Sequence, residues 1–138
     1  ILVAPAETDF SRQIEIVDAM INARVDGIVV APTEATALVT VVERAVREGI
    51  PVTIFDSGIN TDKYVSFVAT NNYNAGVLAA RQLAALLEFE GQIAVVKMVP
   101  GSASTTQREK GFEETLTREF PGIQILAEQY CMADLFSS

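Results

Sequence analysis

Apolar residues in the first part of the chain recur at helical spacing and then as a short continuous run. The helical positions are Phe10, Ile14, Val17 and Ile21. Their spacing predicts an amphipathic helix over residues 9–24, begun by Thr8 and Asp9, whose side chains can accept hydrogen bonds from the first helical amides. The apolar run at 27–31 is ended by Pro32 and predicts a strand that is buried on both faces.

The same alternation continues to residue 69. Helical spacing returns over 33–48, and Gly49 stands where a glycine commonly ends a helix. Residues 51–55 form the next apolar run, which completes a strand, helix, strand order typical of a βα unit. A further strand is predicted over 65–69 with no helix before it, so the rhythm of strands and helices is interrupted there.

The second half repeats the pattern after a polar, uncharged cluster at 70–74, and contains a loop at 100–106 that is rich in hydroxyl side chains. Its predicted elements are a helix around 80–87, a strand at 93–98, a helix with Phe112, Leu116 and Phe120 on one face, and a strand at 123–127. Strands and helices that alternate in this way indicate an α/β fold, a Rossmann-like parallel sheet flanked by helices on both faces.

Parallel strands joined by right-handed crossovers have their carboxyl ends at one edge of the sheet, where open α/β sheets bind ligands. The segments that follow the predicted strands are 33–34, 56–58, 100–106 and 130–132. We therefore expect the functional side chains in these segments.

Composition narrows the functions that the chain can have. Its 138 residues are 49% hydrophobic and 20% charged, as expected of a folded protein with a sizeable core. It contains no His, which excludes an imidazole base, a Ser-His or Cys-His nucleophile and a His metal ligand. The net charge of −8, without a basic patch, argues against nucleic acid as a partner. Neither a GxGxxG nor a GxxxxGKS or GxxxxGKT motif is present, so we expect a binding protein without cofactor or metal rather than an enzyme.

The apolar runs and the cysteine add further limits. No run reaches the ~18 residues that a membrane span needs. Residues 1–5 lack a basic region, so we expect them to belong to a strand entered partway and not to a signal peptide. Cys131 is alone in the sequence, which excludes an internal disulfide, and we expect it as a small buried or half-buried hydrophobic side chain.

Asp56 is the first candidate for chemistry, because it follows the strand at 51–55 and is followed by Ser57 and Gly58. A carboxylate at a strand end can accept hydrogen bonds from two hydroxyl groups, so a polyol is its natural ligand. The alternative is a turn residue whose side chain binds nearby amides. Asp56 and Lys97 also faintly resemble a phospho-acceptor domain, although the interrupted rhythm argues against one.

Arg108 is the second candidate, early in the helix after the hydroxyl-rich loop. Its planar fork of donors can reach the oxygens of a ligand. The alternative is a solvated helix arginine beside Glu109. Ser102, Ser104 and Thr105 lie in the same region, and hydroxyls at such positions more often cap a helix or form a loop than contact a ligand.

Four segments resemble, in order and spacing, the sugar-binding proteins of bacterial ABC transporters, specifically the ribose-binding type. They are 25–33, 49–58, 65–72 and 100–112. The resemblance implies the type I periplasmic-binding-protein fold with two lobes, both incomplete. Residues 1–70 would be an N-terminal lobe lacking its first strand and helix, and residues 71–138 the start of a truncated C-terminal lobe.

The resemblance also assigns roles to residues. It implies that Asp56 binds sugar hydroxyls and that Arg108 is offered by the opposite lobe, with Ser57, Ser104 and Thr106 completing the expected ligand-binding set. Ser57 and Thr106 stand where the ribose binder has basic residues, which argues against ribose itself as the ligand.

The crossing between the lobes falls, by the same resemblance, in the polar cluster. The cluster at 70–74 is expected to be a hinge strand, with Thr70, Asn71 and Asn72 as the hinge. Asn71 stands where an Asp is usual in the family.

The function implied is a receptor that binds a small sugar or polyol between two lobes and delivers it to a membrane permease. Its expected location is the periplasm, or the cell exterior as a membrane-anchored lipoprotein. The alternative is the effector-binding domain of a lactose-repressor-type transcriptional regulator, and a Rossmann-like enzyme is the third reading. We also expect a chain with uncovered sheet edges and helix faces to associate with itself.

Overall fold

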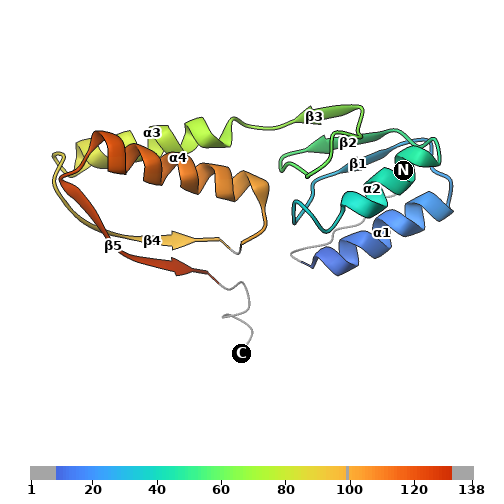
Figure 1. Ribbon diagram of the computed structural model, residues 1–138, viewed down its shortest axis with the longest axis horizontal. Helices are drawn as coiled ribbons and strands as arrows, with labels where there is room; N and C mark the ends of the chain where they lie inside the picture. The colour runs from blue at the N-terminus through green and yellow to red at the C-terminus, as the bar shows by residue number, and fades with distance from the viewer. Residues whose placement is uncertain (1–8, 99, 132–138) are drawn as a thin grey trace. The chain divides into compact units, whose positions relative to one another are not determined.

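The computed structural model describes residues 9–98 and 100–131 (Figure 1). The chain divides into two compact units. Unit 1 comprises Ile1–Ala69 with Gly101–Ala103, and unit 2 comprises Thr70–Pro100 with Ser104–Ser138. None of the helices in the described ranges has the length and apolar character needed to cross a membrane.

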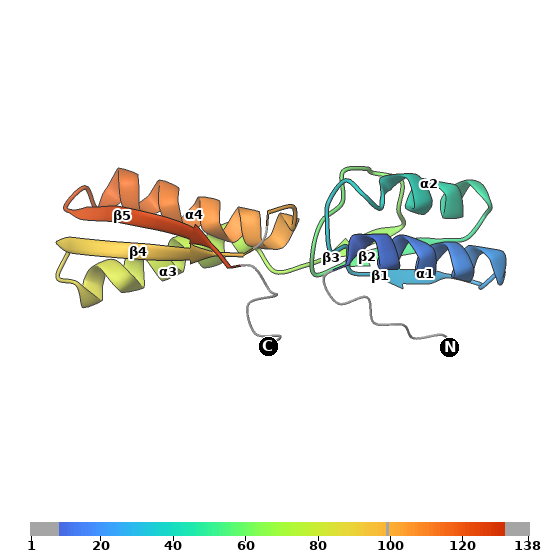
Figure 2. The same cartoon turned by 90° about the horizontal axis from the view of Figure 1, so that it is seen from below.

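Unit 1 is a three-stranded parallel sheet with two helices (Figures 1 and 2). Its elements are α1 (Phe10–Asn22), β1 (Ile28–Val30), α2 (Val39–Arg47), β2 (Val52–Phe55) and β3 (Ser66–Val68). The strand order is β1-β2-β3, with both neighbouring pairs parallel. The two adjacent strands β2 and β3 are joined without a helix, as the sequence predicted.

Both helices of unit 1 pack on the same face of this sheet. The buried cluster beneath them comprises Val17, Ile21, Ile28, Val30, Leu38, Val42, Ala45, Val52 and Ile54. The opposite face carries Val29, Phe55 and Val68, which are 69%, 45% and 64% exposed. Among the described residues the expected helices therefore cover one face and not both. Self-association of the chain stays a prediction.

A single carboxylate determines where α1 begins. Oδ1 of Asp9 accepts hydrogen bonds from the backbone N of Ser11 at 2.8 Å and of Arg12 at 3.2 Å. These amides have no partner within the helix, so the cap stabilises its first turn. The other predicted cap, Thr8, lies outside the described residues. The helix runs to Asn22, close to its predicted end.

The helix predicted over 33–48 begins later than expected, at Val39. The Glu34 carboxylate accepts hydrogen bonds from the backbone N–H groups two and three residues ahead of it, at 2.8 and 2.5 Å. Those bonds hold 35–38 in turns instead of a helix. The predicted end is confirmed, since Gly49 follows the last turn with a φ of 85°, a value that favours glycine.

Unit 2 has two long helices over a two-stranded parallel sheet (Figure 2). Its elements are α3 (Asn72–Leu86), β4 (Gly91–Lys97), α4 (Ala103–Glu119) and β5 (Ile123–Tyr130). Its core comprises Ala80, Ala84, Leu116 and Ile123, with Ile93, Phe112 and Ile125 packed against them. Here too the parallel strands and helices of the predicted α/β class are present.

The hinge strand expected over 70–74 is a wrong prediction for most of its length. Residue Asn72 is already the first residue of α3. The cause is Asn71, whose Oδ1 accepts a hydrogen bond of 3.0 Å from the backbone N of Asn74 and so caps the helix. The polar cluster is therefore a helix start, because Asn satisfies free amides at this position.

The last strand is longer than predicted, and Cys131 lies differently. Strand β5 continues to Tyr130. Cys131 follows it, donates its backbone N–H to the carbonyl oxygen of Lys97 at 2.6 Å, and is exposed instead of buried. The remaining residue of the expected segment 130–132, Met132, lies outside the described residues.

Helices α3 and α4 touch backbone to backbone at two glycines. A methyl group on Gly76 would overlap the carbonyl oxygen of Arg108 and lie 2.7 Å from the backbone N of Phe112. A methyl group on Gly111 would overlap the carbonyl oxygen of Tyr73. Only hydrogen fits at both positions, so the first turns of α3 lie directly against the part of α4 that carries Arg108.

Candidate functional site

Asp56 occupies a tight turn immediately after β2. Its φ is 63°, in the left-handed region that Asp adopts more readily than most residues. The backbone N of Ser57 donates to the carbonyl oxygen of Phe55 at 2.7 Å, and the backbone N of Asp56 donates to the carbonyl oxygen of Val68 at 2.9 Å. These backbone bonds hold the turn without the side chain. In the described ranges no donor engages the Asp56 carboxylate, which leaves it available to a ligand.

The other predicted contacts lie in both units. Ser57, next to Asp56 in unit 1, is 3% exposed. Ser104 is half-buried in the first turn of α4, and Thr106 is exposed two residues further on. Asp56 and Ser57 are thus neighbours at one strand end, and Ser104, Thr106 and Arg108 share the first turns of one helix. That these residues contact a ligand stays a prediction.

Arg108 forms a contact that the sequence did not predict. Its Nη2 donates to Oδ1 of Asn72, on α3, at 2.5 Å. The alternative partner Glu109 is engaged elsewhere, since its Oε1 accepts from the backbone N of Met98 at 3.1 Å. A guanidinium has five N–H donors, so the bond to Asn72 leaves others for a ligand. The sequence feature that could have indicated this contact is Asn72 itself, a second Asn next to Asn71, which caps the helix.

Lys97, at the end of β4, is held between two carboxylates and is 8% exposed. Its Nζ lies 2.6 Å from Oε1 of Glu113 on α4 and 2.7 Å from Oε2 of Glu128 on β5. A β-bulge, at which Leu126 has no partner on β4, brings Glu128 to the face that carries Lys97.

These two carboxylates decide what Lys97 can do. The hydrogen bonds to Glu113 and then Glu128 raise the pKa of Lys97, so the ammonium stays charged and paired. A cation paired with two carboxylates is not free to pair with a phosphoryl group. The resemblance to a phospho-acceptor domain therefore has no support in the structure.

Glu119 ties the second half of α4 to α3. Arg81 donates from Nε and Nη2 to the two carboxylate oxygens of Glu119, each at 2.9 Å, and Nη2 of Arg118 donates to Oε1 at 3.0 Å. The bonds from Arg81, and then from Arg118, lower the pKa of Glu119 to about 2. The bidentate pair of Arg81 and Glu119 is thus a further contact between α3 and α4, in addition to those at Gly76 and Gly111.

We expect the contribution of Glu119 to stability to depend on pH. Its folded-state pKa of about 2 lies below the ordinary 4.5, so the stabilisation is present above pH 4.5 and is lost as the pH falls toward 2. Glu119→Gln should lower the Tm at neutral pH and approach the wild-type Tm near pH 2, measured by thermal unfolding across this range. Glu90→Gln, at an exposed glutamate, is the control. A Tm difference that does not change with pH would contradict the expectation.

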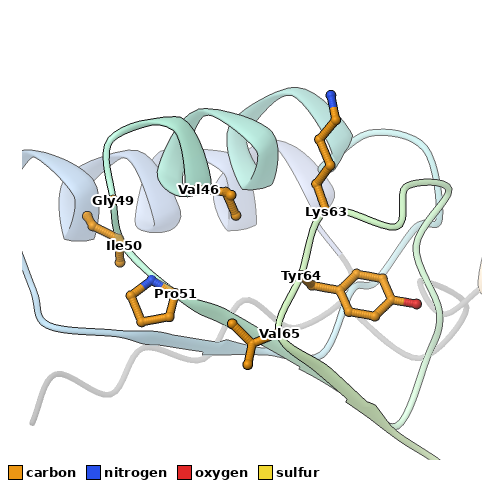
Figure 3. Close-up of a pocket in the computed structure, with 7 residues that line it drawn as sticks. All are labelled: Val46, Gly49, Ile50, Pro51, Lys63, Tyr64 and Val65. Atoms are coloured by element: carbon orange, nitrogen blue, oxygen red, sulfur yellow. The ribbon is translucent and has the colours of Figure 1, made fainter.

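A pocket of about 380 Å³ lies in unit 1, and Figure 3 shows the residues that line it. It lies beside the beginning of β2 and β3, between Pro51 and Val65, whereas Asp56 lies at the end of β2. Its one cation, Lys63, is paired with Oε2 of Glu43 at 3.0 Å. The pocket thus offers mainly apolar surface, and its cation is already paired.

The acidic residues of the chain do not gather into a metal site in the part that the structure describes. Within residues 9–98 and 100–131, no three His, Cys, Asp or Glu side chains are close enough to hold one ion together. Asp56 carries a hydrogen-bond acceptor, and Arg108 carries donors beyond the one that bonds Asn72.

Comparison with known proteins gives a consistent result. A sequence profile described as a periplasmic binding protein domain matches residues 1–135. The ribose import binding protein of Bacillus subtilis (strain 168) is 30% identical over 129 residues, which cover 94% of this chain and 41% of that protein. The xylitol-binding protein of Mycolicibacterium smegmatis is 30% identical over 123 residues, which cover 89% and 35%. The chain thus spans about two-fifths of the length of these relatives.

Solved structures agree with the sequence matches. A carbohydrate transporter solute binding protein from Agrobacterium radiobacter, solved with D-arabinose, superposes with a TM-score of 0.87 at 33% identity, covering 93% of this chain and 45% of that one. The fructose-binding periplasmic domain of a hybrid two-component system superposes with a TM-score of 0.89 at 29% identity, covering 94% and 43%.

Proposed function

Because this chain belongs to the periplasmic binding protein family and has its type I fold, we propose that it contributes to a receptor that binds a small sugar or polyol and delivers it to the permease of an ABC transporter. Its homologues are sugar-binding proteins of such transporters, and the family consists of binding proteins rather than enzymes. The periplasm, or the cell surface by a lipid anchor, is the location that this role requires.

The observation that carries the proposal is the state of Asp56. Its carboxylate stands at a strand end, on a turn held by backbone bonds alone, with no donor engaged in the described ranges. A carboxylate whose hydrogen-bonding capacity is not used by the fold is suited to a pair of ligand hydroxyls. A protein that needed Asp56 only for the turn would gain more from an asparagine or glycine there.

The two units are, in this proposal, the two lobes of the receptor, divided near residue 70. Asp56 and Ser57 of one lobe and Ser104, Thr106 and Arg108 of the other contact the sugar, and Thr70, Asn71 and Asn72 act as the hinge. A ligand that binds the closed state more tightly than the open one shifts the equilibrium toward closure, and the closed form is the one presented to the permease.

The ligand class follows from the donors and acceptors available. The hydroxyl groups of a neutral polyhydroxyl compound can donate hydrogen bonds to a carboxylate and accept them from a guanidinium. Relatives are named for ribose, allose, xylose and xylitol, and similar structures hold D-arabinose or D-fucose. Because Ser57 and Thr106 are neutral, we expect D-ribose not to be the preferred ligand.

The test is a thermal-shift screen of the full-length gene product against D-ribose, D-allose, D-xylose, xylitol, D-arabinose and D-fucose. A true ligand at about 100 times its Kd should stabilise the folded protein by ~2.7 kcal/mol. Sucrose at the same concentration controls for the general stabilisation that sugars give by exclusion from protein surfaces. No specific shift with any compound would reject the proposal.

Sugar sensing is the competing role. The fructose-binding periplasmic domain of a hybrid two-component system has the same fold at a TM-score of 0.89, so the fold also occurs in a signalling receptor. The effector domain of a lactose-repressor-type regulator is the other form of this role. Genes for a permease beside the complete gene would favour transport, whereas a DNA-binding or kinase segment in the same chain would favour sensing.

A further inference from the structure

Asn72 is a buried polar residue whose side-chain amide forms hydrogen bonds with both its nitrogen and its oxygen. It is 7% exposed, at the first position of α3. Its Nδ2 donates to the carbonyl oxygen of Thr70 at 3.1 Å, and its Oδ1 accepts from Nη2 of Arg108 at 2.5 Å. One amide thus joins the chain entering unit 2 to the guanidinium on α4.

The geometry around this contact is held firmly. Gly76 and Gly111 bring the backbones of α3 and α4 together on the adjoining turns. The hydroxyl of Tyr73, next to Asn72, donates to Oε2 of Glu114 on α4 at 2.7 Å. With the helices fixed in this way, the Asn72 amide restricts where the long Arg108 side chain can point.

We propose that Asn72 is a positioning residue that orients Arg108 for ligand binding. This inference rests on the proposed function, in which Arg108 contacts the sugar. Arg108 would otherwise be an exposed side chain with many rotamers, and ordering it at the moment of binding would weaken affinity. The bond to Asn72 orders it beforehand, and the neutral amide leaves the guanidinium charge and its remaining donors to the ligand.

The Thr70 carbonyl gives this arrangement a second consequence. Thr70 lies just before α3, at the division between the two units. A change in the backbone conformation at Thr70 would displace the Asn72 amide and, through it, the Arg108 guanidinium. Asn72, itself part of the proposed hinge, thus connects Thr70 to the proposed ligand contact Arg108 through two hydrogen bonds.

A double-mutant cycle on the full-length gene product tests the inference. The Kd of the best sugar from the panel is measured by calorimetry for the wild type, Asn72→Ala, Arg108→Ala and the double variant. We expect Asn72→Ala to weaken binding about tenfold in the wild type and less than about twofold in the Arg108→Ala background, because neighbours that act as a unit are not additive. Asn74→Ala, at an exposed Asn on the same turn, should leave the Kd unchanged.

A conservative variant separates orientation from folding. Asn72→Asp keeps the oxygen that accepts from Arg108, removes the donor to Thr70 and adds a charge that pairs with the guanidinium, so it should weaken binding less than Asn72→Ala without restoring the wild-type Kd. The Tm of each sugar-free variant shows whether it folds, and Asn72→Ser serves if Asn72→Ala does not.

The outcomes separate the positioning role of Asn72 from the proposed function of the protein. Equal losses from Asn72→Ala in both backgrounds, with Arg108→Ala still weakening binding, would overturn the positioning role and leave the proposed function intact. A wild-type protein that binds none of the sugars would overturn both.

Discussion

Replacing either Asp56 or Arg108 with Ala should weaken sugar binding at least about 100-fold, because each variant loses two hydrogen bonds to a charged group, worth about 1.5–3 kcal/mol apiece. Asp56→Asn is the sharper variant at the first position. Asn tolerates the φ of 63° that the turn requires, so the backbone is preserved while the charge and one acceptor oxygen are lost. At the second position, Arg108→Ala removes the whole fork, and Arg108→Lys should recover only part of the affinity because an ammonium cannot reproduce it.

The measurement is calorimetric titration of the full-length gene product with the sugar that stabilises it most. Asp26→Asn and Lys110→Ala are matched controls, since each removes an exposed charge of the same sign from the same unit. Both controls should bind like the wild type. Unchanged affinity in Asp56→Asn and Arg108→Ala would show that the ligand is bound elsewhere and would remove the basis of the proposed site.

The order of elements was predictable because burial imposes a periodicity that the sequence displays. Val17 and Ile21 recur at helical spacing because α1 covers a sheet, and the strand around Val52 is apolar because it lies in the centre of that sheet. Element ends were less predictable. They depend on single side chains such as Glu34 and Asn71, which bind backbone amides in one case to delay a helix and in the other to begin one.

The candidate site also has a part that the sequence predicts and a part that it does not. Asp56 was predictable, since a polar residue after a buried strand must lie at the sheet edge. The partners of Arg108 and Lys97 were not. Asn72 meets Arg108 only because α3 and α4 approach closely, and Glu128 meets Lys97 only because a bulge shifts the register of β5. Such contacts depend on packing and pairing that no local pattern records.

Gly111→Ala should destabilise unit 2 by about 3 kcal/mol, the upper part of the range for forcing extra volume into a packed interior. Its methyl group would overlap the Tyr73 carbonyl oxygen, which is part of the α3 backbone and cannot rotate away. The expected change is opposite in sign to the usual one, because in a helix without such a close contact Gly to Ala stabilises by about 1 kcal/mol. Gly76→Ala should behave alike, since its methyl group would overlap the Arg108 carbonyl oxygen.

Chemical denaturation of the wild type and these variants measures the effect. Gly27→Ala is the control, because a methyl group there would meet only Pro51, at an ordinary contact distance of 3.7 Å. Any Gly111→Ala protein that stays folded must separate α3 from α4, which lengthens the bond from Arg108 to Asn72. Its affinity for sugar should therefore fall together with its stability. Increased stability in Gly111→Ala would mean that the helices do not touch there, and the close approach that orients Arg108 would be lost with it.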